Sequence, residues 1–209
     1  MLSVCNLTVG DTARVGLLNG SLGRGTVEVI TETFIELSVM LDTKPPEPLP
    51  LMLILALPRP KSLKKCLEAA AAMGVKKLFL IQSWSVEKSY WNSPVLSEET
   101  MREHLLLGLE QGCDTVVPVV EVRRRFKPFV EDELPALARS TRALVAHPYG
   151  ALPCPYRLQG PVTLAIGPEG GFIPYEIEML EKQGFEAVSL GPRILRVEHV
   201  LPALLGRLF

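Results

Sequence analysis

From Leu49 onward, strand-sized apolar runs alternate with segments in which apolar residues recur at helical spacing. The run LMLILAL at 51–57 is continuous, which is typical of a strand covered on both faces of a sheet. Helical spacing follows at 62–73, which Gly74 ends, and at 98–111, where Ser97 is suited to be the N-cap. Strands that alternate with helices predict an α/β domain with a mostly parallel sheet. The further strands that we expect are 77–82, 115–120, 142–147, 162–167 and 186–191, with Pro118 indicating an edge position for the second of these.

The first 44 residues follow a different pattern. Short alternating segments such as 26–29 and 34–37, together with the breaker NGSLGRG at 19–25, predict two to four short antiparallel strands. The stretch DTKPPEPLP at 42–50 then contains four prolines in nine residues and is incompatible with regular structure. We therefore expect a small β domain at 1–44 and an α/β domain at 45–209.

Composition limits the compartment and the kind of site. The chain is 47% hydrophobic, but no apolar run reaches the roughly 20 residues that a membrane helix needs. The N-terminus also lacks the pattern of a signal peptide. Cys5, Cys66, Cys113 and Cys154 are not spaced as metal ligands. We therefore expect free thiols, no metal, no membrane association and a cytoplasmic location.

Charge offers only a local attraction for nucleic acid. The net charge is −1, which gives no global pull toward a polyanion. The segment EVRRRFKPF at 121–129 nevertheless gathers Arg123, Arg124, Arg125 and Lys127 beside two phenylalanines. A solvated basic loop and a phosphate contact are about equally compatible with a cluster this short.

Three loops rich in glycine or proline leave the ends of predicted strands in the last third of the chain. They are AHPYGA at 146–151, GPEGG at 167–171 and GPRILRVE at 191–198. Parallel sheets bind ligands at the carboxyl ends of their strands, so we expect the loops to share one site. Neither a phosphate-binding P-loop nor the dinucleotide fingerprint is present. Because the loops carry little charge and many backbone polar groups, they favour a neutral heterocycle such as adenine.

The motifs IGPEGGF at 166–172 and GFEAVSLGPRILRVE at 184–198 resemble the signature of the SPOUT methyltransferase superfamily. More narrowly, the chain is similar to the bacterial 16S ribosomal RNA (uracil-N3) methyltransferase family, with further matches at EKSYWNSPVL, LLGLEQ and RRRFKPFVEDELP. The resemblance implies an α/β domain with a C-terminal deep trefoil knot, an exception to the rule against knots, preceded by a small, shortened PUA-like β-barrel used on RNA. It also implies S-adenosyl-L-methionine as cofactor, a homodimer, and 16S ribosomal RNA or the 30S subunit as partner.

The resemblance and the loop positions together nominate site residues. Arg196 is the first candidate, and Arg193 the second, for stabilising the charge of a deprotonated uracil; pairing with Glu198 or capping of carbonyls is the structural alternative. Glu169 is either a base or, as we favour, a carboxylate that orders its own turn through backbone N–H groups. The expected cofactor contacts are His147, Pro148, Ile166, Gly167, Glu169, Gly170, Gly171, Leu190, Gly191, Ile194 and Leu195, and the expected RNA contacts are Arg123, Arg124, Arg125 and Lys127.

Two further interpretations stay open at the level of sequence. His199 stands where the family has a small hydroxyl residue, which keeps open a knotted cofactor- or RNA-binding protein without turnover. Ribose 2′-O methylation of RNA is the alternative within the enzyme class. Tyr90 and Trp91 either stack on RNA bases or, as we favour, pack in the core or an interface. The sequence does not identify the general base.

Overall fold

The computed structural model describes residues 7–209, so Cys5 lies outside the described part of the chain. Three antiparallel strands form a small N-terminal sheet in the order β1 (Thr12–Gly16), β2 (Leu22–Ile30) and β3 (Ile35–Thr43). The antiparallel prediction is confirmed, but β2 includes 22–25, which we had assigned to the breaker. The strand can pass through position 23 because this residue is glycine. A Cβ there would lie 1.8 Å from the carbonyl oxygen of Met40, at a register shift between β2 and β3.

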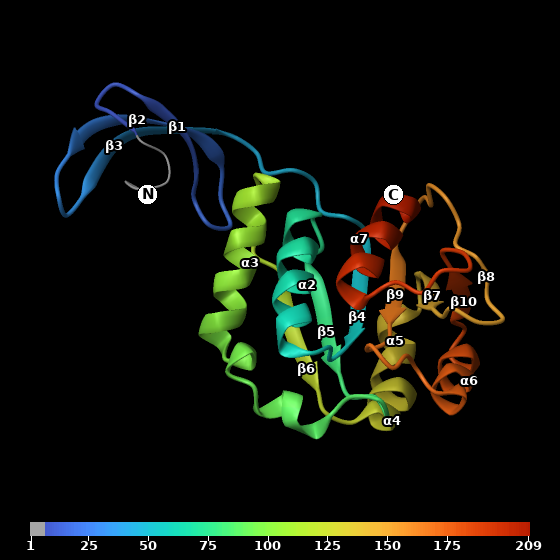
Figure 1. The fold of residues 1–209 in the computed structure, drawn as a ribbon. Helices are drawn as coiled ribbons and strands as arrows, with labels where there is room; N and C mark the ends of the chain where they lie inside the picture. Colours follow the sequence, from blue (N-terminus) through green and yellow to red (C-terminus); the bar gives the residue numbers. More distant parts are fainter. Residues whose placement is uncertain (1–6) are drawn as a thin grey trace.

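The second part is an α/β domain with a seven-stranded sheet (Figure 1). Every strand pair in this sheet is parallel, and the strand order is β6-β5-β4-β9-β7-β10-β8. The fold class expected from the sequence is therefore confirmed. The strands are β4 (Leu51–Ala56), β5 (Lys77–Ile81), β6 (Val119–Arg123), β7 (Arg142–Ala146), β8 (Leu152–Pro153), β9 (Val162–Ile166) and β10 (Glu186–Ser189).

Helices connect these strands and begin where the local chemistry favours it. The longest, α3 (Glu98–Gly112), starts at Ser97, whose Oγ accepts a hydrogen bond of 3.2 Å from the backbone N–H of Thr100. Proline occupies the first turn of α2 (Pro60–Ala72) and α6 (Pro174–Lys182), where its missing N–H is not needed. The remaining helical segments are η1 (Lys88–Asn92), η2 (Pro94–Leu96), α4 (Phe126–Pro128), η3 (Phe129–Glu133), α5 (Leu134–Ala138) and α7 (Val197–Leu208).

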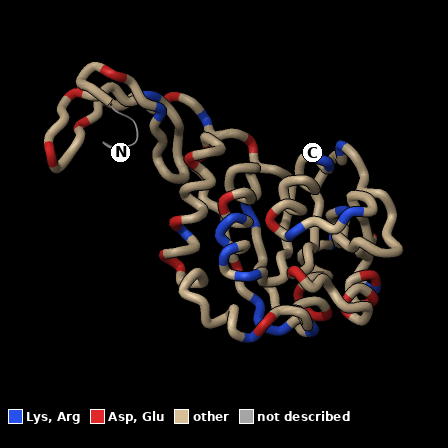
Figure 2. Tube along the Cα trace, in the orientation of Figure 1, with Lys and Arg blue, Asp and Glu red and all other residues tan. Residues whose placement is uncertain are grey.

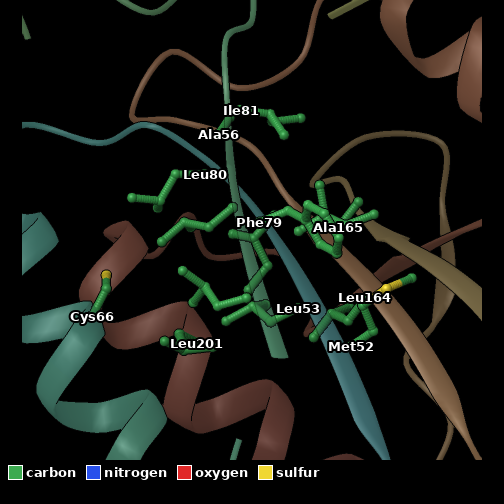
Figure 3. Close-up of a cluster of buried hydrophobic side chains, with 14 of the residues drawn as sticks. Met52, Leu53, Ala56, Cys66, Phe79, Leu80, Ile81, Leu164, Ala165 and Leu201 are labelled. Atoms are coloured by element: carbon green, nitrogen blue, oxygen red, sulfur yellow. The ribbon is translucent and has the colours of Figure 1, made fainter. Parts of the chain in front are cut away.

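The core lies between the central strands and the helices that cover them. All six residues of β4 are buried, as the continuous apolar run predicted, so both faces of the sheet are covered. Figure 3 shows Cys66 of α2 and Leu201 of α7 directed toward Leu53 and Phe79 of the central strands. Since α2 contacts both α3 and α7, these three helices form one layer (Figure 1).

Strand β6 begins later than the predicted 115–120. The carboxylate of Asp114 accepts hydrogen bonds from the backbone N–H groups of Thr115 and Val116, at 2.6 and 2.9 Å, and so holds this stretch in a turn. Pairing with β5 starts only at Val119, after Pro118. The predicted edge position is confirmed, because β6 is the outermost strand beside β5.

The C-terminal segment is threaded through an earlier loop. Strand β10 lies between β7 and β8, although residues 147–151 join those two strands directly. Beyond β10 the chain returns to α2 as α7, and the backbone N–H groups of Arg157 and Leu158 donate to the carbonyls of Arg207 and Leu208. The chain between β7 and β9 thus encloses the passage of β10, which is the arrangement that the resemblance predicted as a knot.

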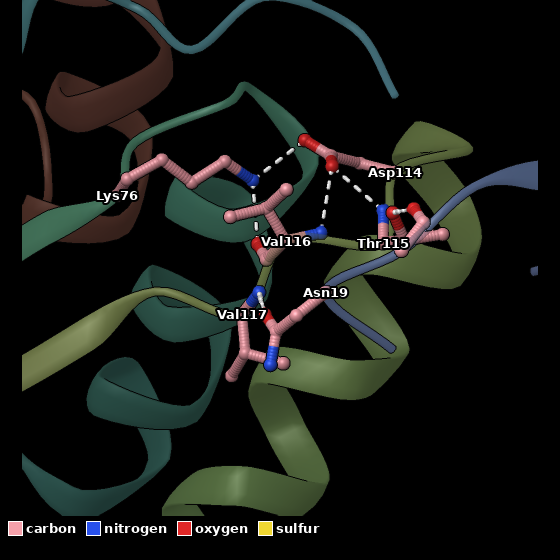
Figure 4. A network of polar contacts seen from close by, with 7 residues as sticks. Asn19, Lys76, Asp114, Thr115, Val116 and Val117 are labelled. Atoms are coloured by element: carbon pink, nitrogen blue, oxygen red, sulfur yellow. Dashed lines mark hydrogen bonds and ion pairs between the residues drawn. The ribbon is translucent and has the colours of Figure 1, made fainter. Parts of the chain in front are cut away.

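A polar network joins the N-terminal sheet to the α/β domain (Figure 4). The side-chain oxygen of Asn19 accepts from the backbone N–H of Val117 at 3.0 Å, and the backbone N–H of Asn19 donates to the carbonyl of Thr115 at 2.8 Å. Behind these contacts Lys76 donates to Asp114 at 2.6 Å. The β1–β2 turn is therefore fixed on the segment between α3 and β6, while residues 44–49 carry no regular structure.

Candidate functional site

One cavity lies at the carboxyl ends of β7, β9 and β10, where the three glycine- and proline-containing loops meet. Its volume is about 510 Å³, within the range of roughly 300–1,000 Å³ that is usual for small-molecule sites. The strand order explains the convergence, because β7 separates β9 from β10 and all three run in the same direction. Three segments that are distant in sequence thereby become the walls of one site.

Every residue expected to contact a cofactor lines this cavity. Arg193 also lines it, whereas Arg196 does not; Arg196 is the N-cap of α7 and is exposed. Sequence reasoning did not select Tyr149 or Phe172, which contribute further apolar wall. The expected contacts found there are His147, Pro148, Ile166, Gly167, Glu169, Gly170, Gly171, Leu190, Gly191, Ile194 and Leu195.

Two positions of the GPEGG turn require glycine, one for lack of space and the other because of its backbone conformation. A Cβ on Gly170 would lie 2.8 Å from the Cβ of Ser85, in the loop that follows β5. Gly171 has a φ of +71°, which L-residues with side chains rarely adopt, and its N–H donates to the carbonyl of Pro168 at 2.8 Å. At these two positions the turn therefore presents backbone rather than side chains to the cavity.

Glu169 acts on a neighbouring element. The sequence favours a carboxylate that orders its own turn, but in the structure Oε1 of Glu169 accepts a hydrogen bond of 3.0 Å from the backbone N–H of Arg59. Arg59 is the N-cap of α2. The carboxylate thus ties the cavity wall to the start of α2.

His147 supplies an uncharged polar group at the cavity. Burial lowers the pKa of its imidazole, although the carboxylate of Glu181 opposes this shift. The ring is therefore neutral at pH 7, since its ordinary pKa is already 6.5. Its Nδ1 is buried without a hydrogen-bond partner, and its ring lies edge-on to that of Tyr149 at 6.1 Å between centroids. A ligand in the cavity can satisfy this nitrogen.

Arg193 and Arg196 keep their charges available. Within residues 7–209 neither arginine forms an ion pair, so the alternative of pairing with Glu198 is not what the structure shows. The pKa of Glu198 is lowered instead by its own backbone N–H, with smaller contributions from Ser62, Lys65 and His199. Both arginines belong to the segment at 191–198, of which Arg193 lines the cavity and Arg196 begins α7.

The basic cluster at 123–127 is divided by the fold. Arg123 donates to Glu133 at 2.7 Å and to Glu121 at 2.8 Å, so its charge is largely neutralised. Lys127 lies 3.8 Å from Glu131, while Arg124 stacks over the ring of Trp91 at 5.3 Å. Arg124 and Arg125 are exposed and have no ion pair within the described chain.

Trp91 itself is buried, as the packing interpretation expected, and is only 9% exposed. In contrast, Trp84 is 79% exposed, and we did not select it from the sequence. The position of Trp84 could have indicated a functional role, because Trp84 follows the end of β5 just as the three selected loops follow the ends of their strands.

Across residues 7–209 no group of three or more His, Cys, Asp or Glu side chains is arranged to hold a metal ion. Within the same residues, every helix is too short or too polar to cross a membrane.

Comparison with known proteins decides the family. The family described as RNA methyltransferase domain matches residues 45–208, which include the whole cavity.

The chain belongs to this RNA methyltransferase domain family.

Relatives with assigned names agree with this family. The chain is 29% identical over 200 residues to the ribosomal RNA small subunit methyltransferase E of Treponema pallidum (strain Nichols), covering 93% of this chain and 75% of that protein. It is 31% identical over 153 residues to the protein of the same name from Synechocystis sp., covering 71% of this chain and 49% of that protein.

Solved structures agree with the RNA methyltransferase fold. A probable rRNA-methyltransferase from Porphyromonas gingivalis superposes with a TM-score of 0.72 at 24% identity, covering 97% of this chain and 86% of that one. The ribosomal RNA small subunit methyltransferase E from Neisseria gonorrhoeae, bound to S-adenosyl methionine, superposes with a TM-score of 0.75 at 19% identity. This match covers 98% of this chain and 84% of that one. At these identities the likeness concerns the fold.

Proposed function

We propose that this protein transfers the methyl group of S-adenosyl-L-methionine to N3 of a uridine in 16S ribosomal RNA of the small subunit. The observation that carries the proposal is the cavity that all three loops line inside the matched RNA methyltransferase domain. The names of the relatives from Treponema pallidum and Synechocystis sp. support ribosomal RNA of the small subunit as substrate.

The cavity suits the proposed cofactor. Its walls are backbone of the GPEGG turn and apolar side chains such as Ile166 and Leu190, with the neutral His147 as a hydrogen-bonding group. A purine binds well against such a wall, because its faces need apolar contact and its edge needs hydrogen-bond partners. The Neisseria gonorrhoeae structure of the same fold was determined with S-adenosyl methionine bound, which supports this choice.

The proposed chemistry is a displacement at carbon. When bound, S-adenosylmethionine supplies a methyl group on a positively charged sulfur. The N3 of uridine loses its proton to water, and its electron pair forms a bond to the methyl carbon. The carbon–sulfur bond breaks with its electron pair remaining on sulfur, so that neutral S-adenosylhomocysteine leaves. Arg196 and Arg193, which have no carboxylate partner among the described residues, stabilise the negative charge that develops on the uracil oxygens.

The remaining parts of the proposal concern assembly. The small domain at 1–44 forms a separate RNA-binding unit, with Arg124 and Arg125 as further phosphate contacts. The protein works in the cytoplasm as a homodimer, in keeping with a ribosomal substrate. Exposed apolar residues near the threaded segment, including Leu152 and Tyr156, are available for an interface between two copies. Sedimentation equilibrium measures the mass, and a purely monomeric species would remove the dimer from the proposal.

Three measurements test the reaction. Calorimetric titration with S-adenosylmethionine should give saturable binding, and labelled methyl should be incorporated into 30S particles isolated without this modification. Nucleoside mass spectrometry should then identify N3-methyluridine. A 2′-O-methylated nucleoside would instead favour the ribose alternative, and cofactor binding without incorporation into any RNA would favour a binding protein without turnover.

A further inference from the structure

The carboxyl edge of the large sheet has a second half beside the cavity. Strands β9, β7 and β10 end at the cavity, while β4, β5 and β6 are followed by segments that carry Arg59, Trp84 and Arg124. Figure 2 shows cations gathered where β6 ends, at the lower edge of the sheet in this view. The two halves are continuous, because β4 pairs with β9.

Trp84 is exposed on a rigid support. Its side chain is 79% exposed, but its backbone N–H donates to Oε1 of Glu176 at 2.8 Å. Glu176 is buried on α6, and its Oε2 accepts from the backbone N–H of Ile173 at 3.1 Å. A buried carboxylate on a distant element therefore fixes the backbone that presents the indole to solvent.

The Trp84 loop adjoins the cavity wall. Ser85, the next residue, packs so closely on Gly170 that no Cβ fits between them. Arg59 follows the neighbouring strand β4, and Tyr90 together with the carboxylates of Glu169 and Glu87 raises its pKa. The Trp84 loop thus has the cavity wall as one neighbour and the segment after β6 as another, because Ile81 at the end of β5 pairs with Arg123 at the end of β6.

We propose that Trp84 is a stacking platform for a base of single-stranded RNA, with Arg124 and Arg125 holding the phosphates of the same strand. This inference rests on the proposed function and names the surface that delivers the substrate to the cavity. Aromatic side chains bind single-stranded nucleic acid through the faces of the bases, and exposed cations meet the backbone. An exposed indole after β5, together with two arginines after the neighbouring β6 that have no ion pair within residues 7–209, fits this chemistry.

The test compares Trp84→Ala, Trp84→Leu and Trp84→Phe in the full-length protein. With undermethylated 30S particles, Trp84→Ala and Trp84→Leu should raise the KM for RNA about tenfold, since the loss of one stacked base has an effect of this order. Trp84→Phe should keep most of the wild-type value, because it retains an aromatic face. The affinity for S-adenosylmethionine should be the same in all four proteins.

A second readout separates this inference from the proposed reaction. RNA fragments of the small subunit should quench the indole fluorescence of the wild type, and this quenching should be absent in Trp84→Ala, which retains the buried Trp91. If the wild type methylates RNA and Trp84→Ala has an unchanged KM, the platform is wrong and the function stands. If the wild type transfers no methyl group, the function fails, and the fluorescence alone then decides: quenching that depends on Trp84 supports the platform, and no such quenching overturns it.

Discussion

At the scale of single residues, the shape of the cavity depends on positions where a side chain is absent. Gly170 faces Ser85 at a separation that leaves no room for a methyl group, and Gly171 needs a positive φ. A side chain added at either glycine must displace the backbone of the turn, so a substitution there should change the shape of the cavity locally and strongly. Arg193 and Arg196 are the opposite case, because their guanidinium groups are exposed and unpaired within the described chain.

Gly170→Val should abolish detectable binding of S-adenosylmethionine while leaving the oligomeric state unchanged. The new side chain cannot occupy the space of Ser85, so the GPEGG turn must shift into or away from the cavity. Calorimetry measures the loss, and sedimentation measures the assembly. Gly206→Ala is the matched control, because a Cβ on Gly206 meets no atom within 4 Å. Wild-type affinity in Gly170→Val would show that the cofactor binds elsewhere.

Arg196→Ala should slow methyl transfer by roughly 10²-fold while preserving affinity for the cofactor. The residue does not line the cavity, and a lost charge-stabilising donor acts on the rate. Single-turnover transfer of labelled methyl, measured beside calorimetric affinity, separates the two effects. Arg193→Ala provides the comparison, since Arg193 does line the cavity and its loss should affect binding as well. An unchanged turnover in Arg196→Ala would exclude this residue from the mechanism.

At the scale of elements, carboxylates connect segments that are far apart in the chain. Glu169 joins the GPEGG turn to the start of α2, and Glu176 joins α6 to the loop after β5. Both accept from backbone N–H groups, which fixes the position of main chain rather than of a flexible side chain. The walls of the cavity are held in this way from two sides.

Glu176→Gln should reduce the free energy of unfolding by about 1–3 kcal/mol, because one amide oxygen replaces two carboxylate oxygens and one backbone N–H loses its acceptor. Burial raises the pKa of Glu176 above its ordinary 4.5, although both N–H bonds oppose the shift. The protonated form therefore favours folding below about pH 4.5, and this contribution is lost as the pH rises through the folded pKa.

Urea unfolding at pH 4.5 and pH 7 measures this dependence. The difference in free energy of unfolding between the wild type and Glu176→Gln should be larger at the lower pH. Glu178→Gln on the same helix is the control, because Glu178 is exposed and should change little at either pH. An equal margin for Glu176→Gln at the two pH values would contradict the raised pKa.

At the scale of the whole molecule, two sheets are held together by a small contact. The β1–β2 turn meets the segment between α3 and β6, and a Cβ on Gly16 would lie 2.6 Å from Cγ2 of Thr115. This joint between the two sheets combines the close approach with the hydrogen bonds of Asn19, with that from Thr115 Oγ1 to the carbonyl of Gly20, and with that from Arg14 to Cys113 Sγ. If both parts bind one RNA, their relative position determines whether the substrate reaches the cavity.

Gly16→Val should loosen the joint and lower stability by about 1–3 kcal/mol, because the added side chain overlaps Thr115. Limited proteolysis should cut the stretch at 44–50 faster than in the wild type, while S-adenosylmethionine affinity stays the same. Thr12→Val, an exposed position on the same strand, is the control. An unchanged cleavage rate would mean that the turn does not hold the sheet in place.

Much of this architecture can be predicted from local pattern. The alternation of apolar runs with helical spacing fixed most strands to within one or two residues, because burial on both faces requires such runs. The loops at 146–151, 167–171 and 191–198 could be assigned to one site, because parallel strands end at one edge. The domain division at 44/45 and the roles of the site residues stay predictions.

What the sequence alone determined was the class of sheet, the position of its loops and the family motifs, since each depends on residues close together in the chain. Only the tertiary structure decided the start of β6 at Val119, the neutralisation of Arg123 by Glu133 and the support of Trp84 by Glu176. These depend on partners from other elements, the last pair being 92 residues apart. A side chain's charge or exposure becomes defined only when the fold brings its partner beside it.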